Sequence, residues 1–595
     1  MSMRALVILC ATSALSALVL ASTAAQAQDF DRIAPKQPKA AATAQLTVPS
    51  QAHITAAAST RTILASLKGL RFVASPAAIV KNGVHQSGVT VAGQGLQLLR
   101  DPGFVARLGA GFLGKPLSLA DLNAIAERVK ARYRRHGLPL VSVTFPAQDI
   151  SSGTVQAVVT VYRLGRVHIS HNGDFSKSLI RSEMQLKPGD PLNIDRLRLD
   201  LNRLSRNPFH PVSVVLAKGA EPGQTDLDLD LHARFPLRVY AAYDNYGEAV
   251  TGRDRYSVGF NVSNLLGLDE QLSYQYMTSP DLWQSRHRAH GLSNAPRFTA
   301  HSLSFLTPLP WGDFLNVFGA YEQMVPNLGP NFGQRGHNVE LGVRYIHDLL
   351  PIGAISHQIS IGFDFKRSDN NLAYGGVSIY GHTANVEQFS ISYAASRPDS
   401  EGQTALTNTL VLSPGGLSNG NTTRAFEAYG TVGAHASYVY DRLELSRVNA
   451  LAYGFTAYVH AEAQIASTEL LPSEQLGAGG PDSVRGYDPR QVNGSNGVLA
   501  SFEVRSPSFS VLHHLDGRLN DDMQLLAFYD FGNVAYQHAQ PYLPRSATLQ
   551  SVGIGARYII NHRLEARFDD GWQLNKAPGA KALGNLATVS LVLSY

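Results

Sequence analysis

The sequence predicts α+β domains followed by an all-β region, namely two small α+β units and then a 16-stranded antiparallel transmembrane β-barrel. Three observations predict this fold class. The chain begins with an export signal, it combines many glycines and aromatic residues with few charges, and its hydrophobic period changes to two after Pro236. A barrel wall needs this period because lipid-facing and lumen-facing side chains alternate along each strand.

Residues 1–27 have the layout of a secretory signal peptide. Arg4 precedes an apolar run that ends near Leu20, and Ala25-Gln26-Ala27 provides a cleavage site after Ala27. The only cysteine, Cys10, lies in this run, so the mature chain is expected to have no thiol. No later segment reaches the roughly 20 consecutive apolar residues of a membrane helix. The mature chain is therefore expected to be periplasmic, secreted or a membrane β-barrel.

The composition favours the barrel among these three. The 595 residues are enough for several domains and include 52 Gly, 24 Tyr and 24 Phe, but only 16% are charged. Soluble domains contain roughly 25% charged residues, whereas outer-membrane barrels carry an apolar outer band with aromatic girdles. The formal net charge of +5 gives no reason to expect nucleic acid as a partner.

Residues 28–60 are expected to form an N-terminal linker or a segment that plugs the pore. Pro35, Pro38 and Pro49 interrupt them, and no apolar period is sustained over two turns. The prolines argue against a plug helix in the first half of this segment.

Residues 61–164 predict a first α+β unit. Ser118 can cap a helix, and Asp121 completes a capping box with Asp in place of the usual Glu. Strands are expected at residues 140–145 and 154–162. The inward face of the helix is apolar and comprises Leu122, Ile125, Ala126, Val129 and Tyr133.

Residues 165–235 predict a second unit of similar design. Asn193 can cap a helix whose inward residues are Ile194, Leu197, Leu201 and Leu204. The other expected elements are a strand at 167–170, a short helix at 175–184, and strands at 212–216 and 225–231.

Residues 236–595 predict the barrel. In the last strand, Val589, Leu591, Leu593 and Tyr595 alternate mainly with small polar residues. About sixteen such segments can be counted, an even number as bacterial barrels require. Two of them are expected to begin at Glu387 and Ala425. An even number returns the chain to the side of the membrane from which it started.

One segment argues against a soluble β-sandwich. Arg563, Glu565, Arg567 and Asp569 alternate with Leu564, Ala566 and Phe568. Four charged side chains on one face need water, and a sandwich would have to bury them. This face is therefore expected to look into an aqueous lumen.

Short motifs in both α+β units resemble a known family. Residues 146–153 (PAQDISSG) resemble the end of a first POTRA domain, and Asn207-Pro208-Phe209 with residues 222–227 (PGQTDL) resemble a second one. With the barrel, they resemble the TpsB family of two-partner secretion transporters, the haemolysin secretion/activation proteins of ShlB/FhaC/HecB type. The resemblance covers Arg61 to Tyr595. It implies two periplasmic POTRA domains ahead of a barrel in the outer membrane of a Gram-negative bacterium.

Two further motifs mark the expected site. The stretch that contains Val484, Arg485, Gly486 and Tyr487 resembles the sixth external loop of the family, and Phe528, Asp530 and Gly532 match its F-x-D-x-G motif on the thirteenth strand. The resemblance implies that this loop, after the eleventh strand, folds back into the lumen and that Arg485 pairs with Asp530. Alternation independently turns Asp530 toward the lumen, where a guanidinium can bind a carboxylate through two hydrogen bonds. Glu503 also lies at an acidic position of the family, and its role stays open.

The predicted function is an outer-membrane pore that recognises an unfolded partner protein in the periplasm and translocates it to the cell surface. The implied partners are a large secreted protein of adhesin or cytolysin type and outer-membrane lipids, with the barrel a monomer. No cofactor, metal or nucleic acid is expected. The main alternative is a barrel-assembly factor of the same superfamily, although such factors typically carry three or more POTRA domains. A passive porin would leave the two periplasmic units without a purpose.

A remote alternative is an outer-membrane esterase, because Gly416 to Gly420 match G-x-S-x-G around Ser418. That motif needs a strand before it and a helix after it. Loop residues flank it here, so no enzyme activity and no catalytic residue are expected. His513-His514 and Asp521-Asp522 do not predict a metal site, because adjacent residues of an extended chain point to opposite sides.

Overall fold

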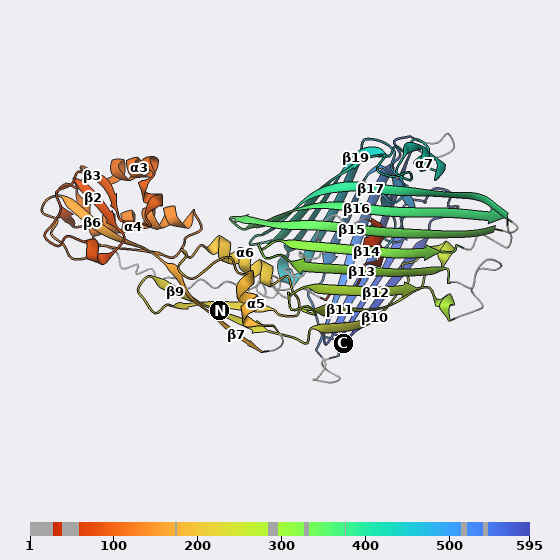
Figure 1. Cartoon of the computed structure of the whole chain (residues 1–595), viewed down its shortest axis with the longest axis horizontal. Coiled ribbons are helices and arrows are strands. Elements are labelled where there is room, and N and C mark those ends of the chain that lie inside the picture. The colour runs from red at the N-terminus through yellow and green to blue at the C-terminus, as the bar shows by residue number, and fades with distance from the viewer. Residues whose placement is uncertain are drawn as a thin grey trace. The chain divides into compact units, whose positions relative to one another are not determined.

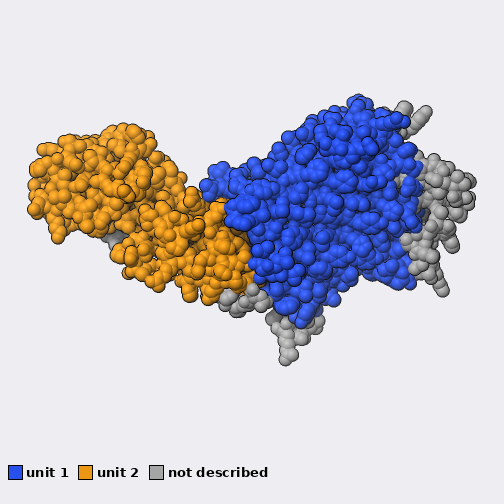
Figure 2. Space-filling model, in the orientation of Figure 1, with its two compact units in different colours: residues 1–42, 206–209, 234–595 blue, residues 43–205, 210–233 orange. Residues whose placement is uncertain are grey.

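The computed structural model describes residues 28–38, 59–172, 175–283, 296–326, 332–374, 377–512, 520–538 and 545–595. The predicted signal peptide lies outside these residues. The chain divides into two compact units (Figure 2). Residues 1–42, 206–209 and 234–595 form the barrel unit, and residues 43–205 and 210–233 form a second unit that contains both α+β folds.

The first α+β fold is a four-stranded sheet in the order β3-β2-β6-β5 with two helices. Phe72, Ile125 and Ala157 are fully buried in its core. The strands are β2 (Gly69–Val73), β3 (Gly88–Ala92), β5 (Val141–Thr144) and β6 (Thr154–Val161), the helices are α3 (Pro102–Phe112) and α4 (Leu119–Arg134), and β1 (Thr62–Leu64) pairs with β4 (Leu117–Ser118).

Helix α4 confirms the local prediction. The Ser118 hydroxyl accepts a hydrogen bond from the Asp121 N–H, and Asp121 Oδ2 accepts one from the Ser118 N–H at 2.8 Å. The bonds from the hydroxyl and the N–H of Ser118 lower the pKa of Asp121. The buried residues of the helix are the five predicted ones, Leu122, Ile125, Ala126, Val129 and Tyr133.

The second α+β fold is a three-stranded sheet in the order β7-β9-β8. Asn193 caps its longer helix as predicted, with Oδ1 accepting from the N–H groups of Asp195 and Arg196 at 3.0 Å. The elements are β7 (Arg163–Asn172), α5 (Lys177–Glu183), α6 (Ile194–Leu204), β8 (Val212–Lys218) and β9 (Gln224–His232).

Sixteen antiparallel strands close the barrel, which confirms the predicted number (Figure 1). The first and last strands pair from Tyr240 opposite Ser594 to Asp244 opposite Ser590, so the barrel begins and ends at the same rim. The strands are β10 (Leu237–Asp244), β11 (Arg255–Ser263), β12 (Gln271–Thr278), β13 (Phe298–Pro308), β14 (Phe314–Met324), β15 (Phe332–Ile352), β16 (Ile355–Tyr374), β17 (Val377–Pro398), β18 (Gly402–Pro414), β19 (Ser437–Ala450), β20 (Thr456–Ala466), β23 (Asn496–Arg505), β24 (Asp521–Ala535), β25 (Ser546–Ile560), β26 (Leu564–Gln573) and β27 (Asn585–Ser594).

The two faces of the wall follow the predicted alternation. Leu591 and Leu593 of β27 are exposed on the outside, whereas Thr588 is buried on the other face. On β26, Phe568 and Trp572 are exposed and Asp569 is buried. Glu565, Arg567 and Asp569 of β26 therefore face inward, and its aromatic residues face outward. None of the helices in the described part of the chain is long and apolar enough to cross a membrane.

Two predicted strand starts were wrong. Strand β17 begins at Val377, well before Glu387, because β15, β16 and β17 run for 21, 20 and 22 residues. A bilayer needs only about 9–11 residues per strand, so the ends of these strands lack the lipid-facing pattern. Ala425 lies in helix α7 (Thr423–Ala428), and the next strand begins only at Ser437. The Thr422 hydroxyl caps α7 by accepting from the Ala425 N–H.

Residues 28–38 lie in the barrel lumen and begin with a short helix, α2 (Gln28–Ile33), seen as the red ribbon within the barrel in Figure 1. Phe30 and Ile33 are buried, and the Phe30 ring lies 4.6 Å from that of Phe318. The expectation that prolines exclude a helix here was wrong, because α2 ends two residues before Pro35. A proline restricts only its own position and the residue before it at a helix end.

Candidate functional site

Residues 467–495, which we call the lumen loop, follow the eleventh strand, β20, and fold back against the inner face of the wall. Two short strands, β21 (Leu476–Ala478) and β22 (Val492–Gly494), pair with each other in this loop. We call residues 469–478 and 490–495 the base of the loop and residues 481–489 its tip. The hallmark motif predicted from the sequence lies in the tip.

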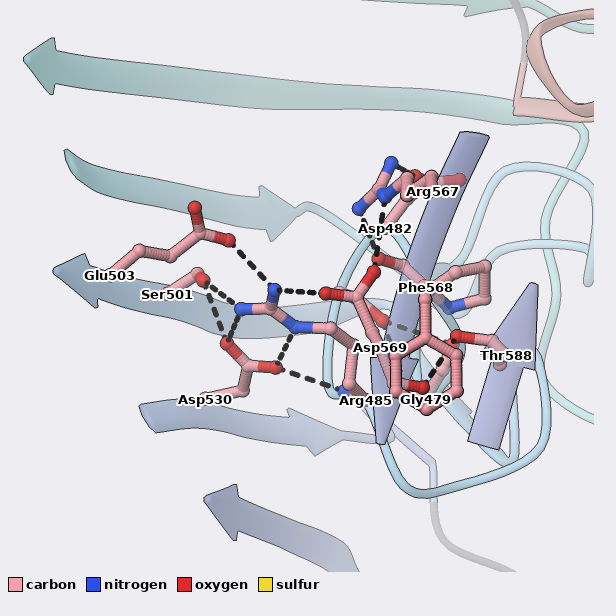
Figure 3. A network of polar contacts seen from close by, with 12 residues as sticks. Gly479, Asp482, Arg485, Ser501, Glu503, Asp530, Arg567, Phe568, Asp569 and Thr588 are labelled. Atoms are coloured by element: carbon pink, nitrogen blue, oxygen red, sulfur yellow. Dashed lines mark hydrogen bonds and ion pairs between the residues drawn. The ribbon is translucent and has the colours of Figure 1, made fainter. Parts of the chain in front are cut away.

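The tip is attached to the wall through Arg485 and Asp530 (Figure 3). Arg485 donates to both carboxylate oxygens of Asp530, from Nε at 2.7 Å and from a terminal nitrogen at 2.8 Å. The backbone N–H of Arg485 donates to the same carboxylate at 3.0 Å. Ser501 adds a fourth donor to Asp530 at 2.7 Å. Asp530 is fully buried. Because Arg485 donates to it from three groups, the Arg485 side chain is held in one orientation.

Two more carboxylates contact the same guanidinium. Arg485 donates to Glu503 at 2.7 Å and lies 3.4 Å from Asp569. The role of Glu503, left open by the sequence, is thus a direct contact with Arg485. Asp569 was predicted only as a lumen-facing residue. Its alternation pattern gave the correct face, but not the contact with a loop 84 residues away.

The wall carries its own cations beside these acids. Arg505 lies 2.6 Å from Glu503, and Arg557 and Arg567 lie 2.9 Å and 3.2 Å from Asp569. Three wall arginines therefore balance three wall carboxylates. The tip carries one cation, Arg485, and two anions, because Asp482 lies 3.4 Å from Arg567 and Asp488 lies 2.5 Å from Arg253. The tip therefore carries one more negative than positive charge.

Close packing surrounds the charged contact. The guanidinium of Arg485 lies 3.5 Å from the centroid of the Phe528 ring, a cation–π distance. Gly486 has φ +90°, and a Cβ there would lie 2.7 Å from the carbonyl oxygen of Gly571. A Cβ on Gly532 would lie 2.8 Å from Val484. Glycine is required at 486 because its backbone lies against that of Gly571, and glycine at 532 leaves room for the Val484 side chain.

Tyr487 closes the far side of the tip. Its hydroxyl donates to the carbonyl oxygens of Gln550 and Asn575 at 2.9 Å and 2.5 Å, and its ring is buried. The predicted motif residues Val484 to Tyr487 and Phe528, Asp530 and Gly532 thus meet in one place, although 41 to 48 positions separate the two motifs in the sequence.

The other motifs considered in the sequence make separate local contacts where the structure describes them. Ser418 lies in the loop between β18, which ends at Pro414, and α7, which begins at Thr423, so neither element flanks it directly. Its hydroxyl accepts a hydrogen bond from Asn385 at 3.0 Å. Asp521 accepts from the N–H groups of Val511 and Leu512. His513-His514 lie outside the described residues. The described residues contain no group of three or more His, Cys, Asp or Glu side chains that could hold a metal ion.

A closed 16-stranded barrel with an inserted lumen loop, on a chain with two small α+β domains that match POTRA families, defines a protein of the POTRA–barrel class. Comparison with known proteins identifies its family. Residues 223–558 match the family described as haemolysin secretion/activation protein ShlB/FhaC/HecB. Residues 87–161 match the ShlB-type POTRA domain, and residues 162–234 match a second POTRA family, the surface antigen variable number repeat. The chain belongs to the ShlB/FhaC/HecB family.

Individual relatives agree with this assignment. The heme/hemopexin transporter protein HuxB of Haemophilus influenzae is 22% identical over 464 residues, which cover 76% of this chain and 77% of HuxB. The hemolysin transporter protein HpmB of Proteus mirabilis is 25% identical over 208 residues, 34% of each chain. The structure of CdiB from Escherichia coli has the same fold, with a TM-score of 0.73 at 17% identity over 95% of this chain and 94% of CdiB.

The protein is therefore a two-partner secretion transporter of the outer membrane. It recognises an unfolded partner protein in the periplasm and translocates it to the cell surface. Its POTRA domains lie in the periplasm and its barrel spans the outer membrane. The predicted alternative, a barrel-assembly factor, is not favoured.

Proposed function

We propose that the contact between Arg485 and Asp530 holds the lumen loop in the transport path and that the passenger protein displaces the tip. The observation that carries this proposal is the fully buried Asp530 carboxylate, which receives three hydrogen bonds from one loop residue. The net energy of a buried ion pair is small after desolvation. Its role here is to position the tip, with Phe528 and Tyr487 setting its orientation.

Residues 28–38 act as a second obstruction in the lumen. The carbonyl oxygen of Ile33 accepts from Gln275 at 2.9 Å and from Ser302 at 2.5 Å, and Lys36 accepts from Arg238 at 2.9 Å. Backbone groups of the segment thus make most of its polar contacts. This segment plugs the resting pore and leaves it before the passenger enters.

The division of labour follows the predicted domains. After loss of residues 1–27, residues 61–164 and 165–235 act as the periplasmic receptor and residues 236–595 as the pore, with residues 28–60 between them and the signal peptide. The closed barrel is formed by one chain and works as a monomer among outer-membrane lipids.

Strand addition is the mode of capture. Strand β8 is the last strand of its sheet, and its alternation leaves Ser213 and Val215 exposed while Val212, Val214 and Leu216 are buried. The open backbone edge of such a strand can pair with an extended peptide and tolerates varied side chains. Folding of the passenger outside the cell buries apolar surface and biases movement without nucleotide hydrolysis.

The passenger is a large secreted protein of adhesin or cytolysin type. The name of one relative supports this class, because HpmB is a hemolysin transporter. A gene for a very large exported β-helical protein beside this one would identify the passenger.

Secretion of the passenger by Arg485→Ala cells tests the role of the tip. We expect export to be lost while the barrel stays heat-modifiable in the membrane. Arg447→Ala is the matched control, since Arg447 of β19 pairs at 2.9 Å with Asp399 of the turn between β17 and β18. Wild-type export from Arg485→Ala would refute the proposal. The exchange Arg485→Asp with Asp530→Arg should restore part of the export, and no restoration would argue against direct pairing.

Deletion of residues 61–164 tests the receptor. We expect it to abolish export but to leave a heat-modifiable barrel, and continued export would contradict the proposed capture step. Depletion of the whole protein separates exporter from assembly factor, because loss of an exporter affects its own passenger and loss of an assembly factor depresses many outer-membrane proteins.

A further inference from the structure

The lumen loop has a second buried contact with the wall, at Glu474 in its base. Lys366 of β16 donates to Glu474 at 2.5 Å, Gln388 of β17 at 2.9 Å, and Tyr440 of β19 at 3.0 Å. The side chains of Lys366 and Glu474 are 4% and 2% exposed. Three donors from three strands therefore converge on one carboxylate, which satisfies its charge without water.

This contact lies on a different part of the wall from the Arg485 contact. In the closed order of the barrel, β24 with Asp530 is the sixth strand after β16 with Lys366. Six of sixteen strands is more than a third of the circumference. The lumen loop is thus attached to two distant regions of one wall and crosses the space between them.

The base is also bonded to itself and to β20. Gln464 of β20 donates to the carbonyl oxygens of Glu474 and Ser495 at 3.0 Å and 3.1 Å. Arg490 donates to the carbonyl oxygens of Pro472 and Gln475 at 2.7 Å and 3.0 Å. These bonds, with the β21–β22 pair, make the base a small rigid body.

Two glycines join the base to the N-terminal end of the tip, and the other end of the tip runs directly into Arg490, which has φ +48°. Gly479 and Gly480 have φ +111° and +103°, values that L side chains rarely adopt. A glycine pair between two anchored parts supplies the rotational freedom of a hinge. Beyond it, the tip meets a wall that is charge-balanced by Arg505, Arg557 and Arg567. When the tip withdraws, these three arginines still equal the three wall carboxylates in number.

We propose that Glu474 is a positioning residue that fixes the base of the lumen loop to Lys366, Gln388 and Tyr440 throughout transport, so that the tip alone swings about Gly479 and Gly480. The loop opens as a hinged flap and does not leave the lumen as a whole. This inference rests on the proposed displacement of the tip by the passenger.

Single cysteines on either side of the hinge test the proposal. Ala478→Cys in the base and Val484→Cys in the tip, each in a Cys10→Ser chain, replace side chains that are 0% exposed. A small water-soluble thiol reagent is added while the passenger protein is being exported. We expect labelling of Cys at 484 to rise roughly tenfold, which is a shift of about 1.4 kcal/mol in the open population, and labelling at 478 to stay at its resting rate. Asp482→Cys, at a side chain that is 82% exposed, is the positive control.

Weakening the anchor should free the base. Adding Glu474→Gln or Lys366→Met to the Ala478→Cys chain should raise its labelling during export to the rate of the tip, and Lys366→Arg, which keeps the cation, should restore the resting rate. Heat-modifiability of each variant reports whether its barrel is folded. Glu474→Gln changes the loop partner of the contact, and Lys366→Met changes its wall partner.

The outcomes separate this inference from the function on which it rests. If position 478 is labelled during export with the anchor intact, or stays unlabelled in both anchor variants, the hinged flap is refuted. If position 484 is never labelled during active export, the proposed displacement of the tip fails, and the anchor variants alone then decide whether Glu474 holds the base.

Discussion

The barrel lumen holds two inserts that are bound in opposite ways. Residues 28–38 are held through their own backbone, since the carbonyl oxygens of Ile33, Ala34 and Lys36 accept from wall side chains. Two of its apolar side chains, Phe30 and Ile33, are also buried. The tip of the lumen loop is held through side-chain charge, with Arg485 among three carboxylates.

The difference teaches how selective each contact is. A backbone carbonyl offers the same acceptor whatever the residue, so most sequences could replace residues 34–38. A buried guanidinium needs a carboxylate in the right orientation, so neither Arg485 nor Asp530 can be changed alone without leaving a buried charge unpaired. Residues 28–38 therefore fill the lumen with little dependence on their sequence, whereas the tip of the lumen loop is a latch that requires both Arg485 and Asp530.

Asp530→Asn should have the largest effect. Removal of one partner from a buried ion pair costs about 3–5 kcal/mol, enough to undock the tip. We expect export to be lost and the current through purified protein in planar bilayers to rise. Asp522→Asn is the matched control, because Asp522 lies on the same strand with its side chain exposed. Equal currents for the two variants would contradict a specific latch.

Phe30→Ala should come next. Truncation of a buried Phe costs about 3 kcal/mol or more, and residues 28–38 have few other apolar anchors. We expect the bilayer current to rise while export continues, since in our proposal this segment leaves the lumen before the passenger enters. A fall in export without a rise in current would show that the segment has a structural role.

Gln275→Ala should have a smaller effect. Its amide donates to two carbonyl oxygens of the segment, Ile33 at 2.9 Å and Ala34 at 3.2 Å. Each hydrogen bond contributes about 0.5–1.5 kcal/mol. We expect more frequent opening in single-channel records with unchanged export, and no change in opening would mean that these bonds do not hold the segment.

Arg32→Gln should have the smallest effect. Arg32 lies 3.4 Å from Glu248, and the two side chains are 41% and 34% exposed. Exposed ion pairs contribute at most about 1 kcal/mol and are screened by salt. Any increase in channel opening should therefore appear at low ionic strength and vanish in 1 M salt. An effect as large as that of Phe30→Ala would overturn the ranking of the contacts.

Local patterns predicted the α+β folds and the faces of the barrel. The capping box of Ser118 and Asp121, and the apolar stripe after it, lie within sixteen residues. Helix α4 could therefore be predicted from local sequence alone. The alternation of residues 563–569 similarly predicts which side faces water. The ends of strands were harder to predict, because β17 extends past the region where lipid imposes an alternating pattern. Helix α7 was not predicted, because its cap residue Thr422 was not recognised.

The site was predictable only in part, because its contacts are long-range. The family resemblance predicted the pairing of Arg485 with Asp530, and alternation predicted that Asp530 faces the lumen. To predict the contact of Glu503 with Arg485, one must know the strand register that sets Ser501 opposite Asp530. To predict the contact of Asp569, one must know that β26 lies two strands beyond β24. The contact of Lys366 with Glu474 spans 108 residues, and no local pattern announces it.

The covalent link between base and tip also sets how fast the latch can close. Ala478 and Arg485 are separated by only six residues, so a displaced tip stays at a high effective concentration beside Asp530. Contact formation across a chain of about ten residues takes about 10–100 ns. If the passenger displaces the tip as we propose, we expect the pore to reseal after its passage by a unimolecular step, at a rate independent of how many transporters the membrane contains.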